Sequence, residues 1–175
     1  QPNRPSAVVN IGGMSNISWF DGVDRTQTIG FDTGPGNALM DAWIRQHRNV
    51  PYDCSGSWAM SGQINTTLLE ACLAHPFLKQ PPPKSTGHED FNLTWLQNLL
   101  PTTIDAVDVQ RTLLEFTARS IAEAIKSMPQ HTTQLWVAGG GALNTGLLQR
   151  LQQLLKDTIV TSSDEHGFAA EWLEA

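Results

Sequence analysis

The most constraining feature of this sequence is a glycine-rich turn that joins an apolar strand pattern to a helical one. The segment 134–138 is a short apolar run typical of a buried strand, three glycines follow at 139–141, and four leucines then recur at helical spacing between Leu147 and Leu154. A further short strand is predicted at 158–161. Because a strand, a helix and a second strand in this order favour two parallel strands with a right-handed crossover, the sequence predicts an α/β fold.

The opening residues predict a three-stranded meander. Strand patterns occupy residues 7–11, 16–20 and 26–31, and tight turns separate them. We expect residues 32–36 to break the third strand, since they are rich in turn-forming residues, and Asn37 to stand at the N-cap of a helix. The expected fold is therefore a mixed sheet that begins with a three-stranded meander and continues through αβα crossovers.

The middle of the chain has a less regular pattern. Residues 49–62 predict a loop, and an amphipathic helix is expected at 64–73. We expect Pro76 and the prolines at 81–83 to exclude regular structure between them, which gives an extended surface loop over about residues 75–91.

Three more helices are predicted in the second half. A short one begins after Asn92, and the strongest periodic signal is a long helix over residues 105–128. Asp105 and Asp108 occupy the cap and third positions of this long helix, where carboxylates meet free backbone N–H groups. Its buried stripe is expected to contain Leu114, Ala118, Ile121, Ile125 and Met128. A last helix is expected over residues 168–173.

Composition narrows the functional class. The 175 residues include 40% hydrophobic side chains, enough for one domain with its own core, and no repeat or second boundary divides residues 1–175. A net charge of −6 counts against nucleic acid or an anionic membrane as the partner. No apolar run is long enough to cross a bilayer and no signal peptide is visible, so we expect a cytoplasmic protein. Cys54 and Cys72 are too few for a disulfide framework and are expected to be reduced thiols.

Three glycine clusters follow predicted strands, at residues 10–16, 32–37 and 139–144. Glycine lets the backbone approach a ligand closely and direct several N–H groups at an anion. The second and third clusters also lead into predicted helices, whose N-termini carry partial positive charge. A tight turn would explain any single cluster, but the three together favour a phosphate or nucleotide site.

Familiar catalytic motifs do not fit. Lys84 is followed by Ser and Thr as at the end of a P-loop, but prolines precede it where the glycine-rich cradle should be. The glycines at 139–141 begin like a dinucleotide fingerprint, but Asn144 replaces its last glycine. The five histidines lack metal-ligand spacing, and Ser15 lacks the glycines of a nucleophile elbow. Asp32 remains as a candidate acid, base or magnesium-water contact, or as a carboxylate that only caps the following turn.

Five sequence strings, taken together, resemble one family. They are NIGGxxN at residues 10–16, GFDTGPGNxLxDxW at 30–43, PPKSTG with Glu89 at 82–89, DVxxTLLE at 108–115 and GGGAxN at 139–144. The same strings occur in this order in the anhydro-N-acetylmuramic acid kinases. The resemblance covers essentially the whole chain, which looks like the second half of such an enzyme.

The resemblance implies a fold of the actin, hexokinase and Hsp70 superfamily, in which two RNase-H-like lobes clamp Mg²⁺ and ATP. It also implies a bacterial enzyme that hydrolyses the 1,6-anhydro ring of anhydro-N-acetylmuramic acid and phosphorylates O6, giving N-acetylmuramic acid 6-phosphate for cell-wall recycling. By resemblance, the nucleotide-binding residues are Asn10, Gly12, Gly13, Asn16, Gly139, Gly140, Gly141 and Asn144. The substrate or cleft residues, again by resemblance, are Asp32, Thr33, Gly34, Gly36, Asn37, Lys84 and Glu89.

The resemblance implies equally what this chain lacks. The family's first phosphate loop and the aspartate that activates the attacking water lie in the N-terminal half, so no catalytic residue and no metal ligand are expected here, beyond a supporting role for Asp32. We therefore expect the chain alone to be inactive, with the N-terminal lobe as its partner and a homodimer left open. His88 stands where the family usually has Arg, which weakens an anion-binding role at that position. The alternatives are another sugar or acetate kinase of the superfamily and a regulatory lobe that binds nucleotide without transferring phosphate.

Overall fold

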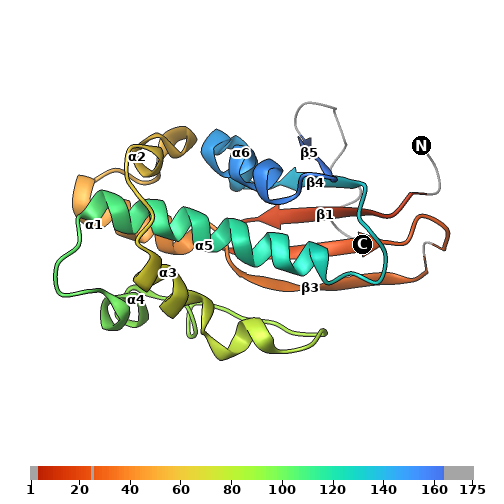
Figure 1. Ribbon diagram of the computed structural model, residues 1–175, viewed down its shortest axis with the longest axis horizontal. Coiled ribbons are helices and arrows are strands. Elements are labelled where there is room, and N and C mark those ends of the chain that lie inside the picture. Colours follow the sequence, from red (N-terminus) through yellow and green to blue (C-terminus); the bar gives the residue numbers. More distant parts are fainter. Residues whose placement is uncertain (1–3, 25, 164–175) are drawn as a thin grey trace.

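The computed structural model describes residues 4–24 and 26–163, and its centre is a five-stranded sheet in the order β3-β2-β1-β4-β5 (Figure 1). The strands are β1 Ser6–Ile11, β2 Met14–Phe20, β3 Thr28–Pro35, β4 Gln134–Ala138 and β5 Ile159–Ser162. Strands β1, β2 and β3 pair antiparallel as a meander, whereas β4 pairs parallel with both β1 and β5. The mixed sheet and the α/β class expected from the sequence are thus observed.

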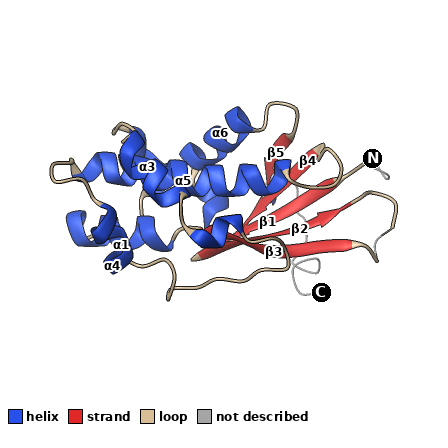
Figure 2. Cartoon of the chain, turned by 60° about the horizontal axis from the view of Figure 1, so that its bottom comes forward, coloured by secondary structure: helices blue, strands red, loops and turns tan. Residues whose placement is uncertain are grey.

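The helices lie over one face of the sheet and extend beyond the end at which β1 and β3 finish (Figures 1 and 2). The α-helices are α1 Ala38–Arg48, α2 Ser57–Met60, α3 Thr66–Leu73, α4 Leu93–Leu99, α5 Ala106–Lys126 and α6 Thr145–Leu154. Three 3₁₀-helices, η1 Cys54–Gly56, η2 Pro76–Lys79 and η3 Gly140–Leu143, lie between them. In the part of the chain that the structure describes, no helix is long and apolar enough to cross a membrane.

The core lies between the sheet and α5. Alternate residues of β1 are buried, and they point to the same side as Leu135 and Val137 of β4. The expected stripe of α5 is buried from Leu114 to Ile125, and Met128 packs against the core in part. Because α2, α3 and α6 contact α5 on its other sides, this helix is buried nearly all round.

The third strand is longer than the sequence predicted. Residues 32–34 lie within β3 and do not break it, because Gly34 and Asp32 keep their pairing with β2 across a register shift. On the other side of the strand, the backbone N–H of Asp32 donates to the carbonyl of Lys84 at 3.1 Å. Paired backbone groups on both sides therefore hold the turn-forming residues in an extended conformation.

Two segments predicted to be irregular contain helical turns. Residues 49–62 include η1 and α2, because both carboxylate oxygens of Asp53 accept backbone N–H groups, from Trp58 and Ala59, at 2.9 Å. The expected loop over residues 75–91 contains η2, which begins at Pro76, since proline is well suited to the first position of a helix. The helix expected over residues 168–173 lies outside the described residues.

Candidate functional site

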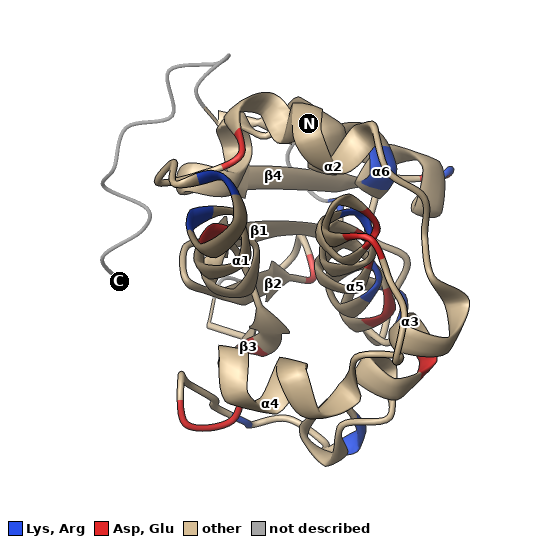
Figure 3. Cartoon of the chain, turned by 90° about the vertical axis from the view of Figure 1, so that its left-hand side faces the viewer, with Lys and Arg blue, Asp and Glu red and all other residues tan. Residues whose placement is uncertain are grey.

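The three glycine clusters converge at the end of β1, although they are far apart in the sequence. A Cβ atom on Gly36 would clash with the carbonyl oxygen of Gly12, and one on Gly141 would lie 2.5 Å from the Cβ of Ile11. A Cβ on Gly139, whose φ of 77° is in the left-handed region, would clash with the Oδ1 of Asn10. In an end-on view, α1 and α5 flank the ends of β1 and β2 at this place (Figure 3). Glycine is therefore required here by close backbone approach.

The β1–β2 turn occupies the N-terminus of α1. The N–H groups of Asn37 and Ala38 donate to the carbonyls of Gly12 and Gly13 at 2.8 and 3.1 Å, and Gly36 N–H donates to Gly13 as well. The side chain of Asn37 does not cap α1 but donates from Nδ2 to the carbonyl of Ile11 at 3.1 Å. The N–H groups at the N-terminus of α1, which were expected to bind an anion, thus bind the β1–β2 turn. The exposed part of this turn is Gly13.

The third cluster is fixed through Asn144. Its Oδ1 accepts from Leu147 N–H at 3.0 Å and so caps α6, as expected for a residue at this position. Gly56 of η1 packs directly against the same side-chain oxygen, and Thr145 Oγ1 donates to the carbonyl of Ser55. Asn144 therefore positions the glycine turn relative to α6. Because it directly follows η3, a contact between Asn144 and the nucleotide, as the resemblance implies, stays a prediction.

Asp32 acts as a clamp on the segment after the prolines. Its Oδ2 accepts from the Ser85 hydroxyl at 3.1 Å and from Thr86 N–H at 2.9 Å. These contacts hold residues 84–86 and not the turn that follows Asp32, and because both end on Oδ2 they leave Oδ1 without a hydrogen bond from a described residue. Its neighbours Thr33 and Gly34 are buried, with the Thr33 hydroxyl bonded to Ser15 at 2.5 Å.

The backbone of Lys84 lies beside Asp32 of the second glycine cluster, but its side chain turns toward η2. Its ammonium donates to the carbonyls of Phe77 and Leu78 at 3.2 and 3.3 Å and stands 4.7 Å from the centre of the Phe77 ring. Burial lowers the pKa of this amine. Glu89 is exposed in the turn that precedes α4. The structure therefore gives Lys84 an anchoring role for η2 and leaves Glu89 near, but not in, the hollow described next.

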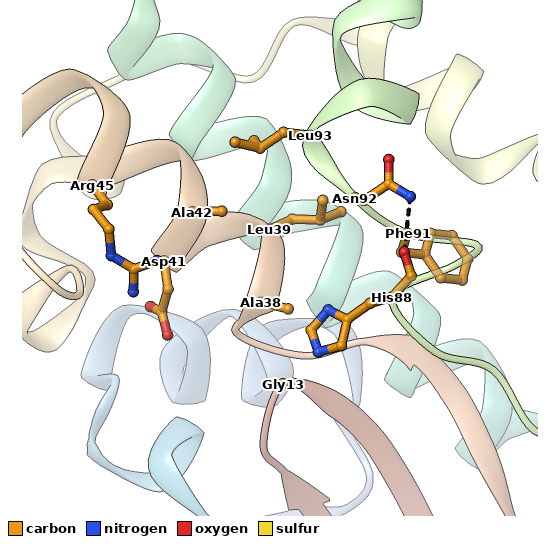
Figure 4. A pocket seen from close by; sticks show the side chains of 10 residues that line it. All are labelled: Gly13, Ala38, Leu39, Asp41, Ala42, Arg45, His88, Phe91, Asn92 and Leu93. Carbon is orange, nitrogen blue, oxygen red and sulfur yellow. Dashed lines mark hydrogen bonds between the residues drawn. The ribbon is translucent and has the colours of Figure 1, made fainter.

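A hollow of about 320 Å³ borders the hairpin turn, between α1 and the segment 88–93 (Figure 4). It is lined by Gly13, Ala38, Leu39, Asp41, Ala42, Arg45, His88, Phe91, Asn92 and Leu93. Burial raises the pKa of Asp41 to about 6, although the positive charge of Arg45 opposes the shift and the negative charge of Asp53 adds to it. Sequence reasoning missed Asp41 and Arg45. A signal was available for Asp41, which belongs to the string at residues 30–43, but not for Arg45.

No group of three or more His, Cys, Asp or Glu side chains that could hold a metal ion occurs within residues 4–24 and 26–163. The candidate site, as the described residues form it, is a backbone cradle with a side pocket.

Solved structures share this architecture. A xyloylose kinase from Brucella ovis superposes with a TM-score of 0.56 at 15% identity, over 97% of this chain and 37% of that chain. Component A of (R)-2-hydroxyglutaryl-CoA dehydratase from Acidaminococcus fermentans superposes with a TM-score of 0.55 at 14% identity, over 90% and 54%. The activator of 2-hydroxyisocaproyl-CoA dehydratase from Clostridium difficile, solved with bound ADPNP, gives 0.53 at 15% identity, over 91% and 54%. At these identities the likeness concerns the fold alone, which this chain shares with part of each of these proteins.

The sequence comparisons define the family. The model of the family described as anhydro-N-acetylmuramic acid kinase matches residues 1–175, and the chain belongs to this family. Relatives of that name are 46% identical over 169 residues in Coxiella burnetii and 47% identical over 171 residues in Pseudomonas fluorescens. These matches cover 96% and 97% of this chain but only 45% and 47% of the relatives. The chain thus spans about half the length of the curated relatives that it matches.

Proposed function

We propose that this chain is one lobe of an ATP-dependent kinase that acts on anhydro-N-acetylmuramic acid in the cytoplasm. In the proposed reaction, water opens the 1,6-anhydro bond while the γ-phosphoryl group of ATP passes to O6, giving N-acetylmuramic acid 6-phosphate and ADP for cell-wall recycling. The observation that carries the proposal is the convergence of three glycine clusters on the end of β1 in a member of this family.

The proposed nucleotide site follows from the shape of this cradle. Gly12 and Gly13 form the hairpin turn that would face the phosphates, and Gly139 to Gly141, with Asn144, would line the adenosine side. The bound nucleotide supplies the phosphoryl group and its leaving group. The chain's own part is to bind and orient the nucleotide. Side chains at Gly36, Gly139 and Gly141 would clash with neighbouring atoms and distort the backbone that does this.

We assign the Mg²⁺ ion to the phosphates, to water and to the other lobe. The Oδ2 atom of Asp32 accepts two hydrogen bonds, which leaves Oδ1 for at most a metal-bound water, and the described residues offer no cluster of three or more metal ligands. A hexacoordinate Mg²⁺ that keeps several waters needs few protein ligands, so this arrangement is compatible with the expected cofactor. The base that activates the attacking water is likewise assigned to the other lobe.

The test is a phosphorylation assay of the full-length kinase with Mg²⁺, ATP and anhydro-N-acetylmuramic acid, with the product mass as the readout. A gain of one phosphoryl group and one water supports the proposal, because simple transfer to a hydroxyl adds no water. Phosphorylation of another sugar in place of this one would assign the chain to a different sugar kinase. Nucleotide binding with no phosphorylated product from any sugar would favour a regulatory lobe.

A further inference from the structure

A second hollow, here called the η2 groove, lies between β3, η2 and the second half of α5 and has a volume of about 570 Å³. Its apolar lining includes Phe31 of β3, Leu78 of η2, Pro82 and, on α5, Ala124. In Figure 1 the yellow-green segment that contains η2 lies below β3 and α5. The volume is within the range of roughly 300 to 1,000 Å³ that is typical of small-molecule pockets.

The η2 groove is separate from the glycine cradle. No residue that lines it also lines the hollow beside Gly13. On α5, Thr117 contacts the cradle, because its hydroxyl donates to the carbonyls of Pro35 and Gly36 at 3.2 and 3.0 Å. The groove residues of α5 follow Thr117 and reach Ser127, ten residues further, which corresponds to about 15 Å along the helix axis. A ligand in the groove would therefore not occupy the proposed nucleotide site.

The polar group at the centre of this argument is the ammonium of Lys84. It has three N–H donors, and the carbonyls of Phe77 and Leu78 accept two of them. The rings of Phe77 and Phe31 lie 4.7 and 5.8 Å from the nitrogen, and none of the ion pairs among the described residues includes Lys84. The charge is thus partly removed from water without being neutralised by a carboxylate, which favours an anionic ligand.

The other charges of the groove point the same way. The ionisable residues that line it are Lys79, Lys84, Arg119 and Glu123. Glu123, the carboxylate among them, already pairs with Lys126 at 3.3 Å. The groove therefore has a local excess of positive charge in a chain whose net charge is −6. A phosphate dianion loses more hydration than a carboxylate between apolar walls, so this lining favours a carboxylate.

We propose that the η2 groove binds a small carboxylate with an apolar body. The carboxylate accepts the third hydrogen bond of the Lys84 ammonium, and the apolar body packs on Phe31, Leu78 and Pro82. This site is independent of the proposed nucleotide cradle, and it gives Lys84 a ligand-binding role in addition to its contacts with η2.

The experiment titrates the full-length kinase with 4-phenylbutyrate, and with the neutral alcohol 4-phenylbutan-1-ol as the matched probe, by ligand-observed NMR. We expect the carboxylate to bind at least fivefold more tightly than the alcohol. Lys84→Met should weaken carboxylate binding at least fivefold and change alcohol binding less than twofold, since it removes the charge and keeps an unbranched side chain. Lys156→Met is the control, because Lys156 is exposed and lies outside the groove, and both affinities should stay within twofold.

A second variant tests the groove without changing its charge. Ala124 lies on its α5 wall and is only partly buried, so Ala124→Leu narrows the groove and should weaken the binding of both probes. This variant also supplies the test if Lys84→Met does not fold. Saturating Mg²⁺, ATP and sugar should leave the affinity for 4-phenylbutyrate within twofold, because the groove and the cradle are separate.

Three results would overturn the proposal. One is the absence of saturable binding of 4-phenylbutyrate to the full-length kinase, which would mean that the other lobe or a second copy covers the groove. Equal affinities for the acid and the alcohol would show that Lys84 recognises no anion. Displacement of the probe by ATP would assign the observed binding to the nucleotide site.

Discussion

At the scale of single residues, the site is defined by what the backbone excludes and by Asp41, a half-buried carboxylate on α1. Gly141 and Gly139 contact residues of β1 so closely that no side chain fits at either position. Asp41, in contrast, is tolerated at a cost, because α1 places it near the helix N-terminus while burial opposes its charge. Both features are local, and each leads to a prediction at its own residue.

The substitution Gly141→Ala tests the cradle. Its Cβ would lie 2.5 Å from two carbon atoms of Ile11, so either β1 or η3 must shift. We expect the affinity for ATP to fall at least tenfold, measured by calorimetry on the full-length kinase. Gly30→Ala is the matched control, since its Cβ would meet only the Ile17 carbonyl at 3.6 Å, and it should leave the affinity within twofold. Equal losses in both variants would contradict the close-approach argument.

Asp41 predicts a pH dependence of stability. Its folded pKa of about 6 lies above the ordinary value of 3.8, so the folded state takes up the proton first, and the burial cost shrinks as the pH falls below about 6 and is gone only below about 3.8. Asp41→Asn should therefore be more stable than the wild type at pH 7.5, by about 1 kcal/mol for a partly exposed group, and this advantage should shrink steadily below pH 6. Thermal unfolding of both proteins across this range measures the difference, in which the groups that the two proteins share cancel. A constant difference would refute the assignment.

At the scale of elements, the site depends on how α5 and α6 are joined. Glu115 of α5 is fully buried and accepts two hydrogen bonds from Arg150 of α6, at 2.6 and 2.8 Å, and one from Arg119 at 2.8 Å. Burial alone would raise the pKa of Glu115, but these hydrogen bonds outweigh it and the pKa lies below its usual value. Because α6 begins at the third glycine cluster, this ion pair fixes that cluster relative to the core.

Replacing Glu115 with Gln should destabilise the fold strongly. The substitution leaves three arginines around a buried neutral group, and breaking a buried pair in this way costs about 3 kcal/mol. Glu123→Gln is the control, because Glu123 and its partner Lys126 are exposed and such a pair contributes less than about 1 kcal/mol. Urea unfolding at pH 7 measures both. Since the folded pKa of Glu115 is lowered, the difference should persist at pH 5 and decrease only as the pH falls below about 4.5.

The elements also show how far the sequence could be used. The long helix, the meander and the cap at Asn92 were predictable, because their signals repeat locally or lie within three residues. Asn37 and Asp105 stand at the expected cap positions, but neither side chain makes a capping hydrogen bond. The continuation of β3 through Asp32 was not, since it depends on partners some fifty residues away in residues 84–86. Asp41 was missed for a related reason: polar positions of an amphipathic helix usually face solvent, and only the folded segment 88–93 turns this one into the wall of a hollow.

At the scale of the whole molecule, the described residues form a backbone cradle, and we expect the groups that act on its ligand to come largely from the other lobe. The described residues supply close backbone approach around Gly12 and Gly141 and a half-buried carboxylate at Asp41, but they bring no metal cluster to the same place. Phosphoryl transfer needs the nucleotide, the attacking water and the sugar in line, and its rate depends on positioning all three together. A single lobe that contacts its ligands from one side leaves them free to reorient.

We therefore expect the 175-residue chain alone to bind Mg²⁺ and ATP weakly and to give no phosphorylated sugar, whereas the full-length kinase turns over. The comparison is made at equal molar concentration, with circular dichroism to confirm that the isolated chain is folded and product mass as the readout. Because a regulatory nucleotide-binding lobe would need no second lobe for affinity, tight nucleotide binding by the isolated chain would favour that alternative. Turnover by the isolated chain would contradict the assignment of the catalytic base to the other lobe, since the base that activates the water would then have to lie among residues 1–175. Product formed only when the separately produced other half is added would place that base, and the remaining side of the clamp, in the partner lobe.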